Sequence, residues 1–276
     1  MKRAAALSAL ACLLALSATA PAASGAPARG GERAAPAAGR TSALDAVPRR
    51  GVLRVCTTGD YPPFSYRDSK TGRYRGVDID MARDLAKSLD ARPRYVPTTW
   101  AGLVGALSAG RCDIAMGGVS VTLPRARAVH FSAPTRTDGK TPLVRCKDKD
   151  KYATLRQIDR PGTRVVVNPD GTNEEFARSH LEHATLTVHR DNTTIFDEIL
   201  AGRADVMMTD ASETRYQARI HPALCSLHPD KPFTFSEKAY AMPRGDNEFK
   251  AYVDQWVHLA THDGTYRKYE DAWMTR

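Results

Sequence analysis

The sequence predicts an α/β fold of two lobes, each built around a parallel sheet with helices on its faces. The first observation is an internal repeat, because residues 109–116 read AGRCDIAM and residues 201–208 read AGRADVMM. The second is that each copy follows a helical pattern of apolar residues and ends in a short apolar strand. The third is that further strand and helix patterns alternate upstream of each copy. Two strand–helix–strand–helix–strand units with right-handed crossovers therefore predict two α/β lobes.

The individual elements follow from apolar periodicity. Strands are expected at residues 52–58, 95–98, 163–168 and 185–189. One helix is marked by apolar residues that recur every four positions: Val77, Met81, Leu85 and Leu89. The helices before the repeats carry one apolar face each: Trp100, Leu103, Val104 and Leu107, then Ile195, Phe196, Ile199 and Leu200. Another helix is expected to start near Thr172, and Gly110 and Gly202 suit left-handed helix C-caps.

A ligand site is expected where the two lobes face each other. In open α/β sheets, ligands bind beyond the carboxyl ends of the strands. Those ends are expected at residues 57–61 and 117–122 in the first lobe, and at 168–173 and 209–210 in the second. The four segments should therefore line one cleft.

The N-terminal segment predicts export. Lys2 and Arg3 precede an apolar run from Ala4 to Ala18, and small residues follow as far as Ala26, which is typical of a cleaved signal peptide over residues 1–26. The run is shorter than the ~20 residues of a membrane span, so no membrane insertion is expected after cleavage. Residues 27–47 have almost no large apolar side chain and are predicted to be a disordered linker. The mature chain should therefore be periplasmic or secreted.

Composition excludes several classes of function. The formal net charge is +9, but the basic residues are scattered, which favours a solvated surface and an anionic small ligand over nucleic-acid binding. The eight histidines form no metal-type motif, and the chain has no phosphate loop or catalytic triad, so no metal or cofactor is predicted. The cysteines outside the signal peptide, which export allows to pair in any of three ways, are Cys56, Cys112, Cys146 and Cys225.

Several motifs resemble the polar amino-acid solute-binding proteins of ABC importers. They are VLRVCTTGDYPPFSY at residues 52–66, GVDIDMA at 76–82, DIAMGGVSVTLPR at 113–125 and FSAP at 131–134. The resemblance spans residues 50–276 and implies a two-lobed, type II periplasmic-binding-protein fold with two hinge crossings, near 138–143 and 235–242. Lobe 1 would comprise residues 48–142 plus 237–276, and lobe 2 residues 143–236.

A second set of motifs resembles a group within that family, the periplasmic cyclohexadienyl dehydratases. These motifs are DGKTP at 138–142, VNPDGTNEEFAR at 167–178, DNTTIF at 191–196, MMTDA at 207–211, HPALC at 221–225 and FSEKAY at 235–240. The resemblance implies a cofactor-independent carbon–oxygen lyase that converts prephenate to phenylpyruvate, arogenate to phenylalanine, or both. The alternative is a non-catalytic amino-acid-binding protein of an importer. The fold implied by the resemblance also favours the cysteine pairs Cys146–Cys225 and Cys56–Cys112.

The resemblance assigns residues to the ligand carboxylate. Arg125 matches the family arginine that holds this group, and a guanidinium pairs well with a carboxylate, although a surface arginine is the alternative. Ser120 and Thr122 would offer hydroxyl and N–H groups beside it. In lobe 2, Gly171, Thr172 and Asn173 should form a helix N-terminus that favours an anion, or an ordinary helix cap.

Other positions concern the rest of the ligand. Tyr61 and Trp100 match residues that sandwich the ligand side chain, with core packing as the alternative. Asp210 matches the aspartate that binds an α-ammonium, or it caps the helix that follows. Asp60 is a further cleft carboxylate without a defined role. Family members often have Tyr where this chain has Thr135, which leaves the substrate preference open.

Glu174 is the predicted catalytic acid. In the GTNE motif it is expected to project into the cleft and to protonate the hydroxyl group that leaves the ring. Burial would have to raise the pKa of its carboxyl, against the opposing effect of the helix N-terminus. The alternative is an exposed glutamate at a helix start, as expected for Glu175. Lys140 would face the ring carboxylate or orient Glu174, or it would be solvated.

Overall fold

The computed structural model describes residues 41–274. The predicted signal peptide and most of the predicted linker lie outside these residues. Within the described range, no helix is both long and apolar enough to cross a membrane.

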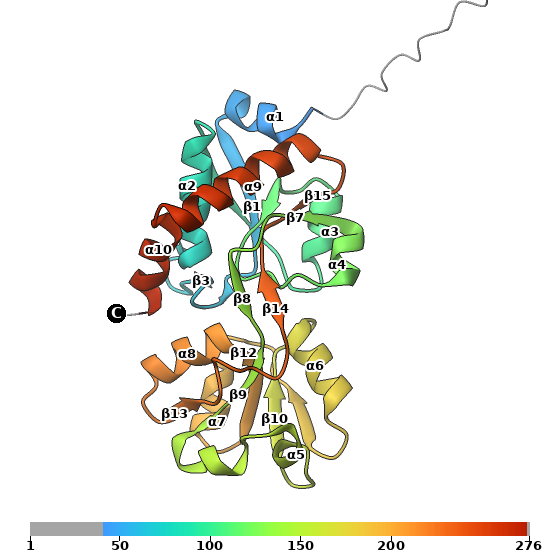
Figure 1. Cartoon of the computed structure of the whole chain (residues 1–276), viewed down its shortest axis with the longest axis vertical. Helices are drawn as coiled ribbons and strands as arrows, with labels where there is room; N and C mark the ends of the chain where they lie inside the picture. Colours follow the sequence, from blue (N-terminus) through green and yellow to red (C-terminus); the bar gives the residue numbers. More distant parts are fainter. Residues whose placement is uncertain (1–40, 275–276) are drawn as a thin grey trace, which may run out of the picture. The chain divides into compact units, whose positions relative to one another are not determined.

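The first lobe is built on a five-stranded sheet in the order β5-β1-β6-β15-β7. The strands are β1 (Val52–Thr57), β5 (Arg92–Pro97), β6 (Ile114–Ala115), β7 (Val129–Phe131) and β15 (Ala241–Pro243). The helices of this lobe are α1 (Ala43–Arg50), α2 (Val77–Ser88), α3 (Leu103–Ser108), α4 (Leu123–Ala128), α9 (Asn247–His262) and α10 (Thr265–Met274). Figure 1 shows α2, α9 and α10 on one side of the sheet and α3 and α4 on the other.

The second lobe repeats this plan around the sheet β11-β10-β12-β9-β13. Its strands are β9 (Lys140–Arg145), β10 (Arg164–Val167), β11 (Thr185–Val188), β12 (Val206–Asp210) and β13 (Leu224–Ser226). Its helices are α5 (Leu155–Ile158), α6 (Thr172–His180), α7 (Ile195–Leu200), α8 (Ala211–Ile220) and the 3-10 helix η1 (Cys146–Lys151). Each sheet thus has three parallel strands at one edge and antiparallel strands at the other. The α/β class is confirmed, but the all-parallel prediction missed the antiparallel strands formed where the chain enters or leaves a lobe.

Two extended segments connect the lobes. β8 (Arg136–Asp138) and β14 (Ser236–Lys238) pair antiparallel and run between the two sheets in Figure 1. β14 lies within the second expected hinge crossing, at 235–242. β8 overlaps the first expected crossing, at 138–143, only at Asp138, because residues 140–145 form β9 in the lobe 2 sheet. Gly139 follows β8, and a Cβ atom there would lie 1.9 Å from the Thr234 carbonyl oxygen, so the crossing accepts only glycine without rearrangement. The small sheet of β2 (Asp60–Tyr61), β3 (Ser65–Arg67) and β4 (Tyr74–Arg75) completes the first lobe.

The chain becomes helical earlier than the sequence predicts. The linker was expected to extend to residue 47, whereas α1 begins at Ala43. The Ser42 hydroxyl caps the helix, and the Ala43 N–H donates to Asp246 Oδ2 at 2.7 Å. Val47 is fully buried against the first lobe. The contacts that order this segment come from residue 246, far along the chain, and are not visible in local composition.

Both predicted disulfides are confirmed. Cys56 on β1 bonds to Cys112 with an S–S distance of 2.09 Å, and Cys146 bonds to Cys225 on β13 at 2.00 Å. The first pair is buried in an apolar cluster of lobe 1, whereas both members of the second are partly exposed.

We expect a mild reductant followed by alkylation and peptide mapping to label Cys146 and Cys225 before Cys56 and Cys112. The reason is access, because attack on a disulfide needs an approaching thiolate and the Cys56–Cys112 pair is buried. Labelling of all four cysteines at one rate under native conditions would contradict this assignment.

Candidate functional site

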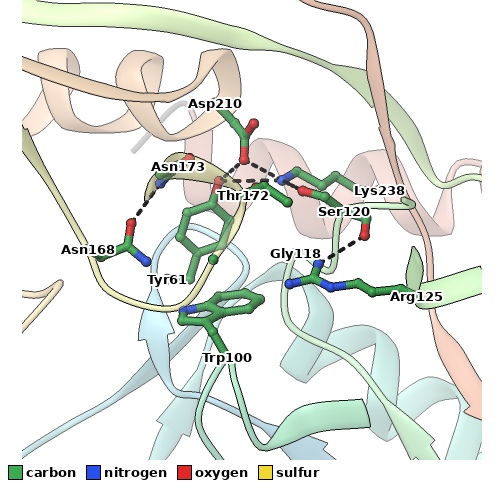
Figure 2. Close-up of a pocket in the computed structure, with 11 residues that line it drawn as sticks. Tyr61, Trp100, Gly118, Ser120, Arg125, Asn168, Thr172, Asn173, Asp210 and Lys238 are labelled. Carbon is green, nitrogen blue, oxygen red and sulfur yellow. Dashed lines mark hydrogen bonds and ion pairs between the residues drawn. The ribbon is translucent and has the colours of Figure 1, made fainter. Parts of the chain in front are cut away.

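A pocket lies between the lobes at the carboxyl ends of the central strands. Its empty volume is about 260 Å³. The lining residues, which are drawn in Figure 2, come from both lobes and from β14: Tyr61, Trp100, Gly118, Ser120, Arg125, Asn168, Gly171, Thr172, Asn173, Asp210 and Lys238. Members of this set come from all four strand ends that the sequence assigned to the cleft, which agrees with the expected position of the site.

Arg125 presents a guanidinium to one side of the pocket (Figure 2). Its backbone N–H donates to the Thr122 hydroxyl, which caps α4, and its Nη1 donates to the Ser120 carbonyl oxygen at 3.0 Å. Desolvation lowers the pKa of Arg125, and no carboxylate within residues 41–274 forms an ion pair with it. The guanidinium therefore retains donors for an incoming anion.

Asp210 lies at the opposite side of the pocket between two lysines. Its Oδ1 accepts from Lys140 Nζ at 2.7 Å, and its Oδ2 accepts from Lys238 Nζ at 2.6 Å. The Tyr61 hydroxyl also donates to Oδ2, at 2.6 Å. Both lysine side chains and the aspartate are buried. Asp210 makes no side-chain cap to α8, so the helix-cap alternative is not what the structure shows.

The pKa values of this cluster follow from its charges. Burial by itself would raise the pKa of Asp210, but the ammonium groups of Lys140 and Lys238 lower it well below its ordinary value. Burial lowers the pKa of Lys140, opposed by Asp210. Burial also raises the pKa of Tyr61 well above its ordinary value, so its hydroxyl remains a donor to Asp210. Asp210 is therefore a permanent carboxylate.

Lys238 was missed by the sequence analysis. In the sequence it is one residue of the FSEKAY motif, and nothing there indicates a role for it. In the structure its ammonium also donates to Ser120 Oγ at 2.8 Å and lies 5.1 Å from the centroid of the Tyr61 ring. Its position on a predicted hinge crossing, beside the expected cleft, was the one available signal.

The start of α6 is already engaged by protein groups. Lys140 Nζ donates to Thr172 Oγ1 at 2.9 Å and contacts Asn173 Oδ1. Asn173 Nδ2 donates to Thr209 Oγ1 at 2.9 Å and to Asn168 Oδ1 at 2.8 Å. Thr172 and Asn173 line the pocket as predicted, but their polar atoms also orient Lys140 and Thr209.

Glu213 on α8 is a buried acid that the sequence analysis did not identify. Its side chain is fully buried, and its Oε2 accepts from the Thr209 hydroxyl. Asn192 Nδ2 lies 3.5 Å from its Oε1 and bridges to the Asp60 carbonyl oxygen in lobe 1. Burial, followed by the nearby Asp210 and Asp60 carboxylates, raises the pKa of Glu213 to about 8, against the hydrogen bond from Thr209. This carboxyl is therefore protonated at neutral pH.

Glu213 lies one hydrogen-bonded residue behind the pocket lining. Thr209 donates to it and accepts from the lining residue Asn173. In the sequence, Glu213 looks like an ordinary first-turn glutamate of a helix. Its pKa depends on burial by β12 and by the segment around Asn192, which local patterning does not reveal.

Glu174 does not line the pocket. Its carboxylate accepts from the Asp170 N–H at 2.8 Å and from Arg178 Nε at 2.8 Å, so it turns back along its own helix. These two contacts, the backbone one first, lower the pKa of Glu174. The expectation that Glu174 projects into the cleft with a raised pKa is not met in this structure, because the helix start and an arginine one turn later favour its anion.

The remaining predicted residues are placed as follows. Tyr61 and Trp100 form adjoining walls, with ring centroids 5.5 Å apart and ring planes at 87°. Trp100 precedes α3 rather than lying on it, which frees its ring to face the pocket. Thr122 caps α4, the helix that carries Arg125. Asp60 does not line the pocket, and burial raises the pKa of its carboxyl. Thr135 donates from its hydroxyl to the Lys238 carbonyl oxygen at 3.1 Å, so it supports β14.

No group of three metal-ligating side chains occurs among residues 41–274. The pocket and the residues directly behind it offer an ionised carboxylate, a protonated carboxyl and cationic side chains. The cationic side chains can hold an anionic ligand.

Comparison with known proteins places the chain in a family. Residues 53–276 match the bacterial extracellular solute-binding proteins, family 3. The chain belongs to this family. Its members share the two-lobed α/β fold described above.

Among curated proteins, the cyclohexadienyl dehydratase of Pseudomonas aeruginosa is 52% identical over 84% of this chain and 86% of its own length. The crystal structure of an ancestral cyclohexadienyl dehydratase is 53% identical, with a TM-score of 0.55 over 86% of this chain and 98% of that one. An ancestral amino-acid-binding protein, described as a precursor of cyclohexadienyl dehydratase, is 38% identical, with a TM-score of 0.78 over 84% of this chain and all of that one.

Replacing Asp210 with asparagine should lower the free energy of unfolding by about 3–5 kcal/mol, because two buried ammonium groups would lose their common counter-ion. Urea unfolding followed by circular dichroism measures the change. Asp230→Asn is the matched control, since its side chain is 89% exposed and its ion pair lies on the surface. Equal effects of the two changes would contradict the assigned role of Asp210.

Proposed function

We propose that this protein is a cyclohexadienyl dehydratase that acts on prephenate, on arogenate, or on both. The observation that carries the proposal is a buried carboxyl, Glu213, with a pKa of about 8, directly behind a pocket lined by cationic side chains. The similarity to curated and ancestral cyclohexadienyl dehydratases at 52% and 53% identity supports the same activity.

The reaction needs one proton and no external electrons. The ring carboxylate of prephenate leaves as carbon dioxide, and its bonding electrons move into the ring. The ring hydroxyl takes a proton from the enzyme and leaves as water, which gives phenylpyruvate. Hydroxide is a poor leaving group, so a general acid that is protonated at the working pH lowers the barrier. The acid then regains its proton from solvent.

Glu213 is the proposed acid. Glu213 lies one hydrogen-bonded residue behind the pocket lining, so its proton is proposed to pass through Thr209. The Thr209 hydroxyl gives its own proton toward the pocket and takes the proton of Glu213. Asp210, three residues before Glu213 in the chain, stays ionised because the ammonium groups of Lys140 and Lys238 lower its pKa. Two carboxyl groups on adjoining elements thereby have separated pKa values, as an acid and a fixed anion require.

The cations and rings supply binding. Arg125 is proposed to hold one carboxylate of the ligand, since its guanidinium has no acidic partner in the described chain. Lys140 and Lys238 make the opposite side positive, and Tyr61 and Trp100 flank the space between. The flat cyclohexadienyl ring suits these walls.

The acid can be tested with matched glutamine variants. Glu213→Gln should lower kcat for phenylpyruvate formation by about 10²–10⁴-fold, because general acid catalysis contributes an effect of that size. Glu174→Gln should stay within a few-fold of the unchanged protein, since it replaces a partly exposed group that pairs with Arg178. Full activity of Glu213→Gln together with an inactive Glu174→Gln would return the role to Glu174.

The pH dependence follows from the protonated state of Glu213. Because the acid must carry its proton, kcat/KM for prephenate should be constant below pH 8 and fall as the pH rises through about 8. Stopped assays of phenylpyruvate between pH 6 and pH 9.5 would measure this limb. A kcat/KM that falls about tenfold per pH unit across the whole of this range would instead indicate an acid with an ordinary carboxyl pKa, already ionised at pH 6.

Amino-acid delivery to an importer is the second candidate function. Membership of family 3 and the likeness to the ancestral amino-acid-binding protein favour it. Tight binding of an unmodified amino acid without turnover of prephenate would support it over the dehydratase. For either function we propose that residues 1–26 direct export to the periplasm or the cell exterior, as the N-terminal sequence and the extracellular family indicate.

A further inference from the structure

We propose that Lys238 makes this site selective for the keto acid prephenate over the amino acid arogenate, by occupying the place of a ligand ammonium on Asp210. The inference rests on the proposed dehydratase function and specifies its substrate. The two substrates differ only in their side chain, which carries a keto group in prephenate and an ammonium group in arogenate. The carboxylate of Asp210 is the group in the pocket that can distinguish them.

Both carboxylate oxygens of Asp210 are already occupied by donors. Each of its oxygens already accepts from a lysine ammonium, at 2.7 and 2.6 Å, and Oδ2 accepts from the Tyr61 hydroxyl as well. A ligand ammonium would need to displace one of these donors. The displaced lysine would be a buried, unpaired cation, which is strongly unfavourable.

Several buried contacts hold the Lys238 side chain in place. Its side chain is 2% exposed, donates to Ser120 Oγ at 2.8 Å and lies beside the Tyr61 ring. Its backbone is paired with β8 across the hinge, at the register Lys238–Arg136. These contacts keep the ammonium group at one position in the pocket lining.

The charged groups at the pocket are mostly cationic. Arg125, Lys140 and Lys238 are cations in or next to the pocket, and Asp210 is the ionised carboxylate among the lining residues. Asp60, Asp138 and Glu175 lie outside the pocket lining, and protonated Glu213 adds no charge. Prephenate carries two negative charges and no positive one, whereas the ammonium of arogenate cancels one of its two. The positive pocket favours the ligand with the larger negative charge.

The experiment compares kcat/KM for prephenate and arogenate in the full-length mature protein. The unchanged protein should prefer prephenate by at least about tenfold, and Lys238→Met should reduce that ratio by about tenfold or more, because it frees one oxygen of Asp210 for the arogenate ammonium. Lys238→Arg keeps the charge and should keep the preference. Lys87→Met, a surface change of equal charge on α2, should leave the ratio unchanged.

A binding measurement covers the case in which Lys238→Met folds poorly or turns over neither substrate. Titration calorimetry with Glu213→Gln should show phenylpyruvate binding more tightly than L-phenylalanine, a pair that differs only at the keto or ammonium position. Adding Lys238→Met or Lys140→Met should narrow this difference. Thermal unfolding of each variant identifies any loss of fold.

The outcomes separate the two proposals. If the unchanged protein turns over neither substrate, the dehydratase function fails, while the binding pair still tests the selectivity. If it turns over arogenate as well as or better than prephenate, or if Lys238→Met leaves the ratio unchanged in a folded protein, the selectivity of Lys238 is overturned and the dehydratase function stands.

Discussion

The buried cluster of Asp210, Lys140 and Lys238 is the interaction on which the site depends. Asp210 ends the central strand of lobe 2, Lys140 begins β9 beside it, and Lys238 ends the returning hinge strand. Their ion pairs, together with the Tyr61 hydroxyl from lobe 1, join both lobes and the hinge at one point. Because removal of one partner would leave uncompensated buried charge, the cluster fixes the positions of the groups around it.

The same cluster separates the roles of the two buried carboxyls. Asp210 receives two ammonium groups and stays ionised, while Glu213, one helical turn later, receives only neutral donors and is raised to a pKa of about 8. The negative charge of Asp210 adds to the burial that keeps Glu213 protonated. In the proposed reaction, this protonated carboxyl is the source of the proton. Arg125, on the first lobe, has no acidic partner there and is available for a ligand carboxylate.

The sequence was informative where function follows from chain direction and period. Apolar periodicity located β1, β10 and β11, and the rule that ligands bind at strand ends brought Tyr61, Ser120, Asn173 and Asp210 to one pocket. It failed where a side chain's role depends on distant packing. Glu174 and Glu213 both look like first-turn glutamates, and only burial by other elements distinguishes the one that is protonated. The role of Lys238 likewise depends on its ion pair with Asp210, which lies 28 positions away along the chain.

The central claim is that Glu213 carries a proton at neutral pH in the folded protein. Infrared difference spectroscopy between the unchanged protein and Glu213→Gln, recorded from pH 6 to pH 9.5, measures this directly through the stretching band of a protonated carboxyl. The account predicts a band present at pH 7 that disappears as the pH rises through about 8. A difference spectrum that shows an ionised carboxylate at pH 7 would contradict it.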